Sequence, residues 1–232
     1  MQSFGHHFCQ KVAGSTRSVV SSSNTIENTM SNKFYELAFT PSVKAAQEHY
    51  GTRKNYARFE DGEPNPQTLT DLESDFIERC DGFYMATVNE NGQPYIQFRG
   101  GPPGFLKVIN DRTLGFADFR GNLQYISVGN LAANDRAALF LMDHANRRRL
   151  KIFGRIDVHD AQDEPELIEM LTVPDHKATN ERAMIIHVEA FDWNCPQHIT
   201  PRFTIDEIRQ MNKPLYDRIE ELELKTANCE PS

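Results

Sequence analysis

The sequence of 232 residues has no long apolar run, few cysteines and no excess of positive charge. Its longest apolar windows are strand-sized, far short of the roughly 20 residues that a membrane-spanning helix needs, which argues against a membrane protein. The formal net charge is −8 and the pI about 5.5. Because binding to backbone phosphates requires a dominant basic face, this balance argues against a nucleic-acid partner.

The four cysteines, Cys9, Cys80, Cys195 and Cys229, form no Cys-x-x-Cys pair and no regular framework. Such scattered cysteines fit reduced thiols in a cytoplasmic protein. Cys195 and His198 have a spacing found in zinc sites, but no second pair of suitable ligands stands at comparable spacing. We therefore predict no metal site.

Catalytic and nucleotide-binding motifs are also missing. The sequence has no Gly-x-Gly-x-x-Gly, no P-loop, no His-Glu-x-x-His and no nucleophile elbow, and its eight histidines do not cluster as a triad would. If the protein performs chemistry, a cofactor must supply it.

Changes in composition divide the chain into four segments. Residues 1–30 are rich in serine and contain no acid before Glu27, which indicates a disordered extension, with a transit peptide or a true start at Met30 as alternatives. Residues 31–68 are predicted to form a helical arm and linker, and residues 69–203 the main domain. Residues 204–232 are predicted to form a C-terminal amphipathic helix and tail.

Helical patterns occur on both sides of the main domain. In the arm, Val43, Ala46 and Tyr50 recur at helical spacing and predict a packing surface. The sequence Thr-Asp-Leu-Glu at 70–73 is a capping-box signature that opens a helix over residues 70–80.

The C-terminal helix is predicted to begin with a second capping box, at 204–207. Pro214 should kink it. A packed surface helix or a dimer contact explains its apolar side better than a ligand site does, and this side contains Ile205, Ile208, Met211, Leu215, Ile219 and Leu222.

Most of the main domain reads as short strands separated by turn residues. Along the strand at 149–159, apolar and charged residues alternate, as in a half-buried strand. The fold class is mainly β with peripheral helices (α+β). Consecutive hairpins without strand-helix alternation favour a small closed or split antiparallel barrel over a parallel sheet. The predicted strands are 83–88, 95–99, 105–110, 113–119, 137–142, 149–159 and 184–191.

The stretch from Gln97 to Leu131 has the character of a phosphate-binding site. Glycines at 100, 101 and 104 can bring bare backbone close to a ligand, although a tight connection without a ligand is the alternative reading. A Gly-Asn pair at 121–122 then opens a short helix, with Asn122 as its predicted cap and Gly129 as its predicted stop. Helix N-termini and neighbouring cations hold anions, so a phosphorylated small molecule is the expected ligand class.

Five motifs follow one another along the main domain. They are Phe-Tyr-Met-Ala-Thr-Val at 83–88, Pro-Tyr-Ile-Gln-Phe-Arg at 94–99, Gly-Gly-Pro-Pro-Gly-Phe-Leu-Lys at 100–107, Ala-Asp-Phe-Arg-Gly-Asn at 117–122 and Asp-Trp-Asn-Cys-Pro-Gln-His at 192–198. In this order they resemble the pyridoxamine 5′-phosphate oxidase-related flavoproteins, over roughly residues 60 to 205. The resemblance implies an antiparallel split β-barrel of the FMN-binding type and a homodimer with FMN at the subunit interface. It also implies an oxidoreductase.

The same resemblance implies a set of FMN-binding residues. Those expected at the phosphate are Lys107, Arg120, Asn122 and Gln124. Those expected nearer the ring and ribityl chain, or along the same strand and turn, are Arg99, Phe116, Ala117, Asp118 and Gly121. Those expected from a neighbouring strand or from the second subunit are Arg148, Arg149, Trp193 and Arg202.

Structural explanations compete with several of these roles. Lys107 is also explained as a solvated lysine on a strand, and the basic run at 147–151 as the start of a strand with alternate residues in solvent. Trp193, the only tryptophan, is also explained as a residue that seals a core or interface.

The sequence departs from the true oxidase, because the substrate-binding Arg-x-His segment and the Arg-Leu-x-Pro terminus are absent. Pyridoxamine phosphate is therefore doubtful, and the small-molecule substrate is unknown. The leading hypothesis is an FMN-dependent oxidoreductase. A flavin carrier or sensor without turnover and a heme-binding barrel with a histidine ligand are the alternatives.

Overall fold

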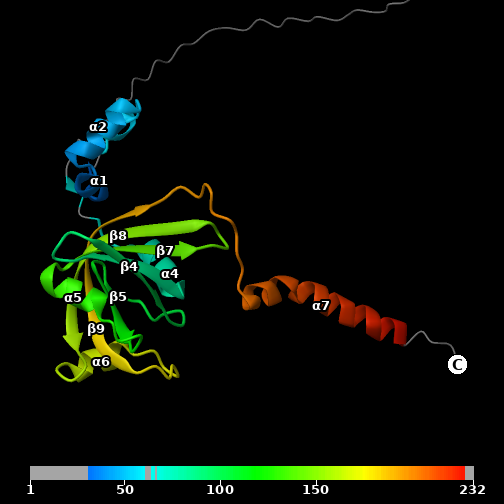
Figure 1. Ribbon diagram of the computed structural model, residues 1–232. Coiled ribbons are helices and arrows are strands. Elements are labelled where there is room, and N and C mark those ends of the chain that lie inside the picture. The colour runs from blue at the N-terminus through cyan, green and yellow to red at the C-terminus, as the bar shows by residue number, and fades with distance from the viewer. Residues whose placement is uncertain (1–30, 61–63, 66, 228–232) are drawn as a thin grey trace, which may run out of the picture.

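The computed structural model describes residues 31–60, 64–65 and 67–227 (Figure 1). The predicted N-terminal extension, most of the turn at 61–66 and the last five residues of the tail lie outside the described residues. In chain order, the elements are β1 (Ser31–Asn32), α1 (Lys33–Ala38), α2 (Pro41–His49), α3 (Arg53–Ala57), β2 (Pro64–Asn65), α4 (Asp71–Arg79), β3 (Gly82–Val88), β4 (Pro94–Gly100), β5 (Lys107–Asn110), β6 (Thr113–Phe119), α5 (Ile126–Ala133), β7 (Arg136–Asp143), β8 (Arg148–Asp160), α6 (Pro165–Leu171), β9 (Asn180–Trp193) and α7 (Ile205–Ala227).

Seven strands form one sheet in the order β4-β3-β7-β8-β9-β6-β5, and every neighbouring pair is antiparallel. Two of these pairs are the predicted hairpins β3–β4 and β5–β6. The sheet curls around a single core, and its two edge strands do not pair with each other. This confirms the predicted antiparallel split β-barrel with peripheral helices.

Alternation along the strands builds the core. On β3, for example, Phe83, Met85 and Thr87 are buried, while Tyr84 between them is exposed. β8 follows the same rule, with Leu150 and Ile152 in the core, as its predicted alternation requires. The ring of Phe83 stacks on that of Phe105 and meets Phe116 edge-on, which ties the two sides of the barrel together.

The segment between β4 and β5 passes across the split. Phe105 and Leu106 are buried in the core, so the strand predicted from residue 105 begins only at Lys107. A Cβ on Gly100 would lie 2.8 Å from the Phe98 ring, and one on Gly101 would lie 2.7 Å from Phe105. These glycines therefore make room for aromatic rings of the chain itself, which supports the tight-connection reading.

Helix α4 closes one end of the barrel and has the predicted capping box. The Thr70 hydroxyl accepts a hydrogen bond from the Leu72 N–H, and the Thr70 N–H donates to Glu73 Oε2 at 3.0 Å. Phe76 and Ile77 on the inner side of the helix join the core.

The N-terminal arm packs on the outside of the sheet through α1. Phe34 is buried and its ring stacks on Phe153 of β8 at 4.5 Å between centroids. The Tyr35 hydroxyl donates to Asp192 of β9 at 3.4 Å, and burial together with this carboxylate raises the Tyr35 pKa. The predicted packing surface on α2 is wrong, because none of the residues of that helix is buried.

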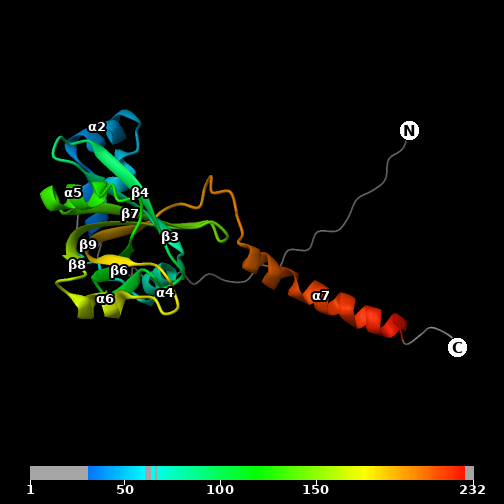
Figure 2. The same ribbon diagram turned by 60° about the horizontal axis from the view of Figure 1, so that its bottom comes forward.

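At the C-terminal end, α7 stands away from the barrel (Figures 1 and 2). Thr204 and Glu207 form its capping box, as predicted, and the helix continues through Pro214 without ending. None of the described helices combines the length and apolar character needed to cross a membrane.

Candidate functional site

The split in the barrel creates the candidate site. Strand β5 pairs only with the first half of β6, so the second half, Phe116–Phe119, has no strand partner on that side. Gln97 and Arg99 of β4 lie opposite this unpaired half. The split thus leaves an open hollow between the two strands, with backbone and polar side chains on its walls.

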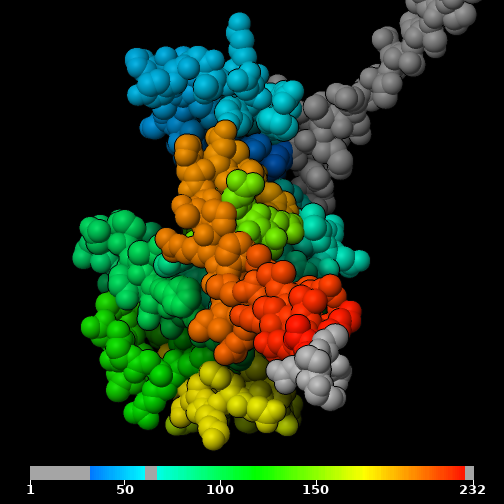
Figure 3. Space-filling model, turned by 90° about the vertical axis from the view of Figure 1, so that its right-hand side faces the viewer, coloured from blue at the N-terminus to red at the C-terminus, as the bar shows by residue number. Residues whose placement is uncertain are grey.

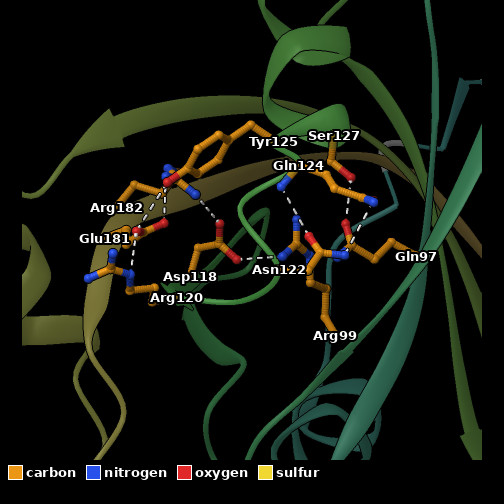
Figure 4. A network of polar contacts seen from close by, with 10 residues as sticks. All are labelled: Gln97, Arg99, Asp118, Arg120, Asn122, Gln124, Tyr125, Ser127, Glu181 and Arg182. Carbon is orange, nitrogen blue, oxygen red and sulfur yellow. Dashed lines mark hydrogen bonds and ion pairs between the residues drawn. The ribbon is translucent and has the colours of Figure 1, made fainter.

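A carboxylate held by two arginines forms the buried wall of the hollow (Figure 4). Asp118 at the end of β6 is 2% exposed, and its Oδ1 accepts from Arg99 at 2.6 Å. Its Oδ2 accepts from Arg182 of β9 at 2.8 Å. Because breaking one member of such a buried group leaves uncompensated charge, the three side chains hold one another in place.

Arg182 links this group to a second carboxylate. Its NH2 group donates to Glu181 at 2.9 Å, and its guanidinium lies over the Tyr125 ring at 4.9 Å. Burial acts to lower the Arg182 pKa, but the hydrogen bonds and charges of Asp118 and Glu181 outweigh it and raise the pKa. The guanidinium therefore carries a fixed positive charge at this wall.

Arg99 keeps a donor without a partner. Its Nε is buried and makes no hydrogen bond to the described residues, although its NH1 is bound to Asp118. A buried unsatisfied donor costs free energy unless water or a ligand accepts from it. Arg99 is thus the residue most suited to gain a bond when a ligand enters.

The turn between β6 and α5 forms the second wall. Leu123 and Tyr125 have positive φ, and the Asn122 side chain accepts from the Gln124 N–H at 3.1 Å. Asn122 therefore shapes the turn and does not cap the helix as predicted, because α5 begins four residues later, at Ile126. Gly129 lies inside α5, so the predicted helix stop there is also wrong.

The start of α5 has free donors. Its N-cap residue, Tyr125, has left-handed backbone geometry and makes no side-chain capping bond. The first-turn amides, which line the hollow at Ile126, Ser127 and Val128, are therefore left to water or a ligand. Helix α5 is fixed against β3 and β4 because Asn130 donates to Thr87 at 2.9 Å and Ser127 to Gln97 at 3.1 Å.

Gly121 leaves the middle of the hollow open. It lies on the wall of both parts of the hollow, and a Cβ added to it would find no atom within 4 Å. The larger part of the hollow has a volume of about 190 Å³. That is less than the roughly 300–1,000 Å³ of a typical ligand site, so the hollow of the single chain does not by itself enclose a ligand of that size.

The structure brings eight of the thirteen predicted site residues to this hollow. They are Arg99, Phe116, Ala117, Asp118, Arg120, Gly121, Asn122 and Gln124.

Lys107 does not join them. Its Nζ donates to the backbone oxygens of Met170 at 2.7 Å and Thr172 at 3.1 Å, which are unpaired carbonyls at the end of α6. Lys107 lines neither part of the hollow. The structure therefore places the Lys107 ammonium at the C-terminal end of α6 and not on the wall of the hollow, where its predicted phosphate role requires it.

The other four residues lie away from the hollow of their own chain. The Arg148 guanidinium lies 4.4 Å over the Trp193 ring, and the Trp193 indole donates to Glu73 at 2.7 Å. Arg149 has a buried Nε without a hydrogen-bond partner among the described residues, and Arg202 is exposed. Within one chain, Arg148 and Trp193 belong to a different cluster, around Glu73, and the predicted contact of all four residues from a second subunit stays a prediction.

Several residues that line the hollow were not predicted from the sequence. The most important are Arg182, Glu181, Tyr125, Ser127 and Gln97. A weak signal existed for Arg182 and Glu181, because two charged residues directly precede the apolar run of a predicted strand.

Comparison with known proteins shows the family to which the chain belongs. The family profile described as pyridoxamine 5′-phosphate oxidase matches residues 69–194, more than half of the chain. The chain belongs to this family. The matched segment holds all seven strands of the sheet and every residue of the hollow. No curated protein gives a significant sequence match.

The solved structures to which this chain is similar have low sequence identity with it. HupZ of Group A Streptococcus is 18% identical, with 58% of this chain and 99% of that one covered and a TM-score of 0.45. A Clostridium acetobutylicum protein of the pyridoxinephosphate oxidase family, related to general stress protein 26 of B. subtilis, is 20% identical, with 59% and 94% covered and a TM-score of 0.38. An FMN-binding protein from Syntrophomonas wolfei is 12% identical, with 64% and 97% covered and a TM-score of 0.38.

Proposed function

We propose that the protein binds FMN in the hollow beside Asp118 and acts as an oxidoreductase on a small molecule other than pyridoxamine phosphate. Membership of the pyridoxamine 5′-phosphate oxidase family supports the flavin. The observation that carries the proposal is the hollow itself, where two guanidiniums held by one carboxylate lie beside an uncapped helix start.

The residues present fit a phosphorylated ligand. Arg120 is exposed beside the turn, and together with Asn122, Gln124 and the first amides of α5 it would hold the phosphate. Arg99 would offer its free Nε to the ribityl chain or the ring, with Asp118 and Arg182 fixing its position. Gly121 leaves the space that the ligand would fill.

When bound, FMN would supply the hydride chemistry. The protein's own residues would bind and orient it and limit the access of water. No histidine or lysine lines the hollow of the described chain, so no side chain of that kind is placed there to carry a proton.

A second copy of the chain would complete the enclosure. The outer face of β3 and β4 carries three exposed apolar side chains, Tyr84 (44%), Phe98 (56%) and Ile96 (62%). Phe98 also lines the hollow, so a partner that covers this face would reach the edge of the ligand site. A homodimer built in this way would bury the apolar face and close the hollow.

Cys80 and Cys195, the two cysteines among the described residues, are free thiols, which supports a cytoplasmic location. Burial raises the Cys80 pKa to about 12.

A flavin carrier or sensor without turnover is the second candidate. It uses the same hollow, and the observation that favours it is the absence of an acid-base side chain of the histidine or lysine type there. Heme with a histidine ligand has less support for the same reason.

Titration of the purified protein with FMN and with riboflavin tests the binding proposal. We expect FMN to bind at least about tenfold more tightly, since only FMN offers a phosphate to Arg120 and the α5 amides. Equal affinity for the two flavins would contradict the assigned phosphate position. Reduction of the bound flavin followed by exposure to air separates the candidates, because fast reoxidation supports the oxidoreductase and slow reoxidation the carrier.

A further inference from the structure

Helix α7 presents an apolar stripe that nothing in the described chain covers. The helix has 23 residues, none of them buried, and it projects from the barrel (Figure 1). In Figure 3, its orange-to-red surface lies in front of the barrel, on the side that faces the viewer. Its large apolar side chains are between 46% and 70% exposed. A stripe of this length costs solubility unless a partner buries it.

The stripe follows a seven-residue repeat. With Ile205 as position a, the next heptads begin at 212, 219 and 226, and the a and d positions form one side of the helix, called the seam below. The a positions are Ile205, Asn212, Ile219 and Thr226, and the d positions are Ile208, Leu215 and Leu222. Regular spacing of 3.5 residues is the pattern of a helix that pairs with another helix, while a helix lying on a sheet needs only a broader 3.6-residue stripe.

We infer that α7 pairs with α7 of a second copy of this chain as a parallel two-stranded coiled coil. Ile at a with Leu at d favours two strands in the parallel arrangement, and a single Asn at an a position fixes register and strand number. Here Ile219 and Leu222 supply the first feature and Asn212 the second.

The flanking positions agree with parallel pairing. In a parallel pair, each g residue meets the e residue of the following heptad on the other helix. Arg218 at g would then meet Glu223, a pair of opposite charge, and Met211 would meet Tyr216, a pair of apolar bodies. In an antiparallel pair, Asn212 would lose its Asn partner and would face an apolar residue, which leaves its amide unsatisfied.

Pro214 is compatible with this seam. It occupies position c, on the side of the helix that faces away from the partner, so neither its ring nor the carbonyl that lacks a donor lies in the interface. Arg218 now pairs with Glu221 of its own helix, and the exposed position of both lets Arg218 change partner at little cost.

Disulfide trapping in the full-length protein tests the inference. Cys9→Ser, Cys195→Ser and Cys229→Ser remove the other thiols, and the buried Cys80 is kept. Ile208→Cys and Leu222→Cys then probe the two ends of the seam, with Glu220→Cys at position b as the control. We expect both d-position variants to form covalent homodimers under mild oxidation, at least about fivefold more than Glu220→Cys, because a disulfide needs Cβ atoms within about 4.5 Å.

Two results would overturn the inference. One is a lack of homodimers for both d-position variants, or equal trapping of Glu220→Cys. The other is trapping of Ile208→Cys only when these chains are mixed with chains that carry Ile219→Cys, because in antiparallel helices a d position faces an a position of the partner. Flavin binding plays no part in the readout, so the outcome is independent of the proposed function.

Charge reversal at the flanking positions gives a second test. In the Leu222→Cys background, Arg218→Glu should reduce trapping at least about twofold, because it places Glu opposite Glu223 of the partner. Adding Glu223→Arg should restore trapping. Failure of the double variant to recover would contradict parallel g-to-e pairing.

Discussion

Two clusters of charged and aromatic residues lie at different places on this barrel, and they differ in what they leave unsatisfied. Around Glu73, the carboxylate accepts from Thr70 and Trp193, and the Arg148 guanidinium lies 4.4 Å over the indole ring. Around Asp118, Arg99 keeps a free buried Nε, and an open hollow lies beside it. Residues of the same kinds thus stabilise the fold around Glu73, whereas around Asp118 they leave a free donor beside open space, which is the feature on which the proposed ligand site rests.

Asp118→Ala should have the largest effect on stability. It leaves Arg99 and Arg182 buried without their common carboxylate, and we expect a loss of about 3–5 kcal/mol in the free energy of unfolding. Denaturation by urea measures it. Asp157→Ala is the control, because Asp157 and His187 form an exposed pair, and it should cost less than about 1 kcal/mol. Equal losses for both variants would show that the Asp118 group is not a buried unit.

Ile96→Lys tests whether ligand binding beside Asp118 depends on a second subunit, since the cluster around Glu73 should not. The side chain is 62% exposed, so the single chain should fold, while the proposed dimer contact is lost. We expect monomers in light scattering and a loss of FMN affinity of about a hundredfold, or ~2.7 kcal/mol. Tyr50→Lys, at the exposed C-cap of α2, is the matched control. A stable dimer that keeps full affinity would place the interface elsewhere.

Gly121→Leu should fill the hollow without disturbing the fold. A side chain at this position meets no protein atom at its Cβ, and the backbone does not have positive φ. We expect FMN affinity to fall at least about thirtyfold, or ~2 kcal/mol, while the unfolding free energy stays within about 1 kcal/mol of the parent. Gly129→Ala, at an exposed position in α5, should leave both unchanged or stabilise slightly. Unchanged affinity for Gly121→Leu would move the ligand out of the hollow.

Glu73→Gln should affect stability and not FMN binding. Burial acts to raise the Glu73 pKa, but hydrogen bonds from Thr70 and Trp193 outweigh it and lower the pKa below 4.5. A carboxylate with a lowered pKa stabilises the folded state above the unfolded pKa, and the contribution disappears as pH falls through the folded pKa.

The free energy of unfolding of Glu73→Gln should therefore be about 1–2 kcal/mol lower than that of the parent at neutral pH and equal to it in strong acid. Unfolding curves at several pH values measure this difference. Glu90→Gln in the exposed hairpin turn is the control and should show no such pH dependence. A difference that persists in strong acid would mean that the charge of Glu73 is not the cause.

Lys107→Met should have the smallest effect. The change removes the bonds to Met170 and Thr172 at the end of α6, and we expect a loss of about 0.5–1.5 kcal/mol in stability. FMN affinity should not change. A large loss of FMN with intact stability would restore the phosphate role that the sequence suggested.

The strand pattern of this barrel was predictable because it is local. The alternation along β8 and the Asn-Gly turn between β3 and β4 each act over a few residues, and so does the capping box at Thr70. The predictions that failed depend on contacts between distant segments. Lys107 lies on a strand that the sequence identified, but the carbonyls that bind it come from residues more than 60 positions away.

The same limit applies to the site. Asp118, Arg120 and Gly121 lie at and just after the end of one strand, β6, and their common location could be inferred from the sequence. Arg182 joins them only because β9 pairs with β6 in a register that sets it opposite Asp118, and no local pattern predicts that register. Asn122 was assigned as a helix cap because a Gly-Asn pair often opens a helix, whereas here its side chain closes a turn before the helix begins.

The most direct measurement is the absorption spectrum of freshly purified full-length protein, with the released small molecule identified by mass, for the parent and for Gly121→Leu. The account predicts a flavin spectrum and FMN in the parent, with little flavin in the variant. A colourless parent that does not take up added FMN, or a variant that retains as much FMN as the parent, would contradict it.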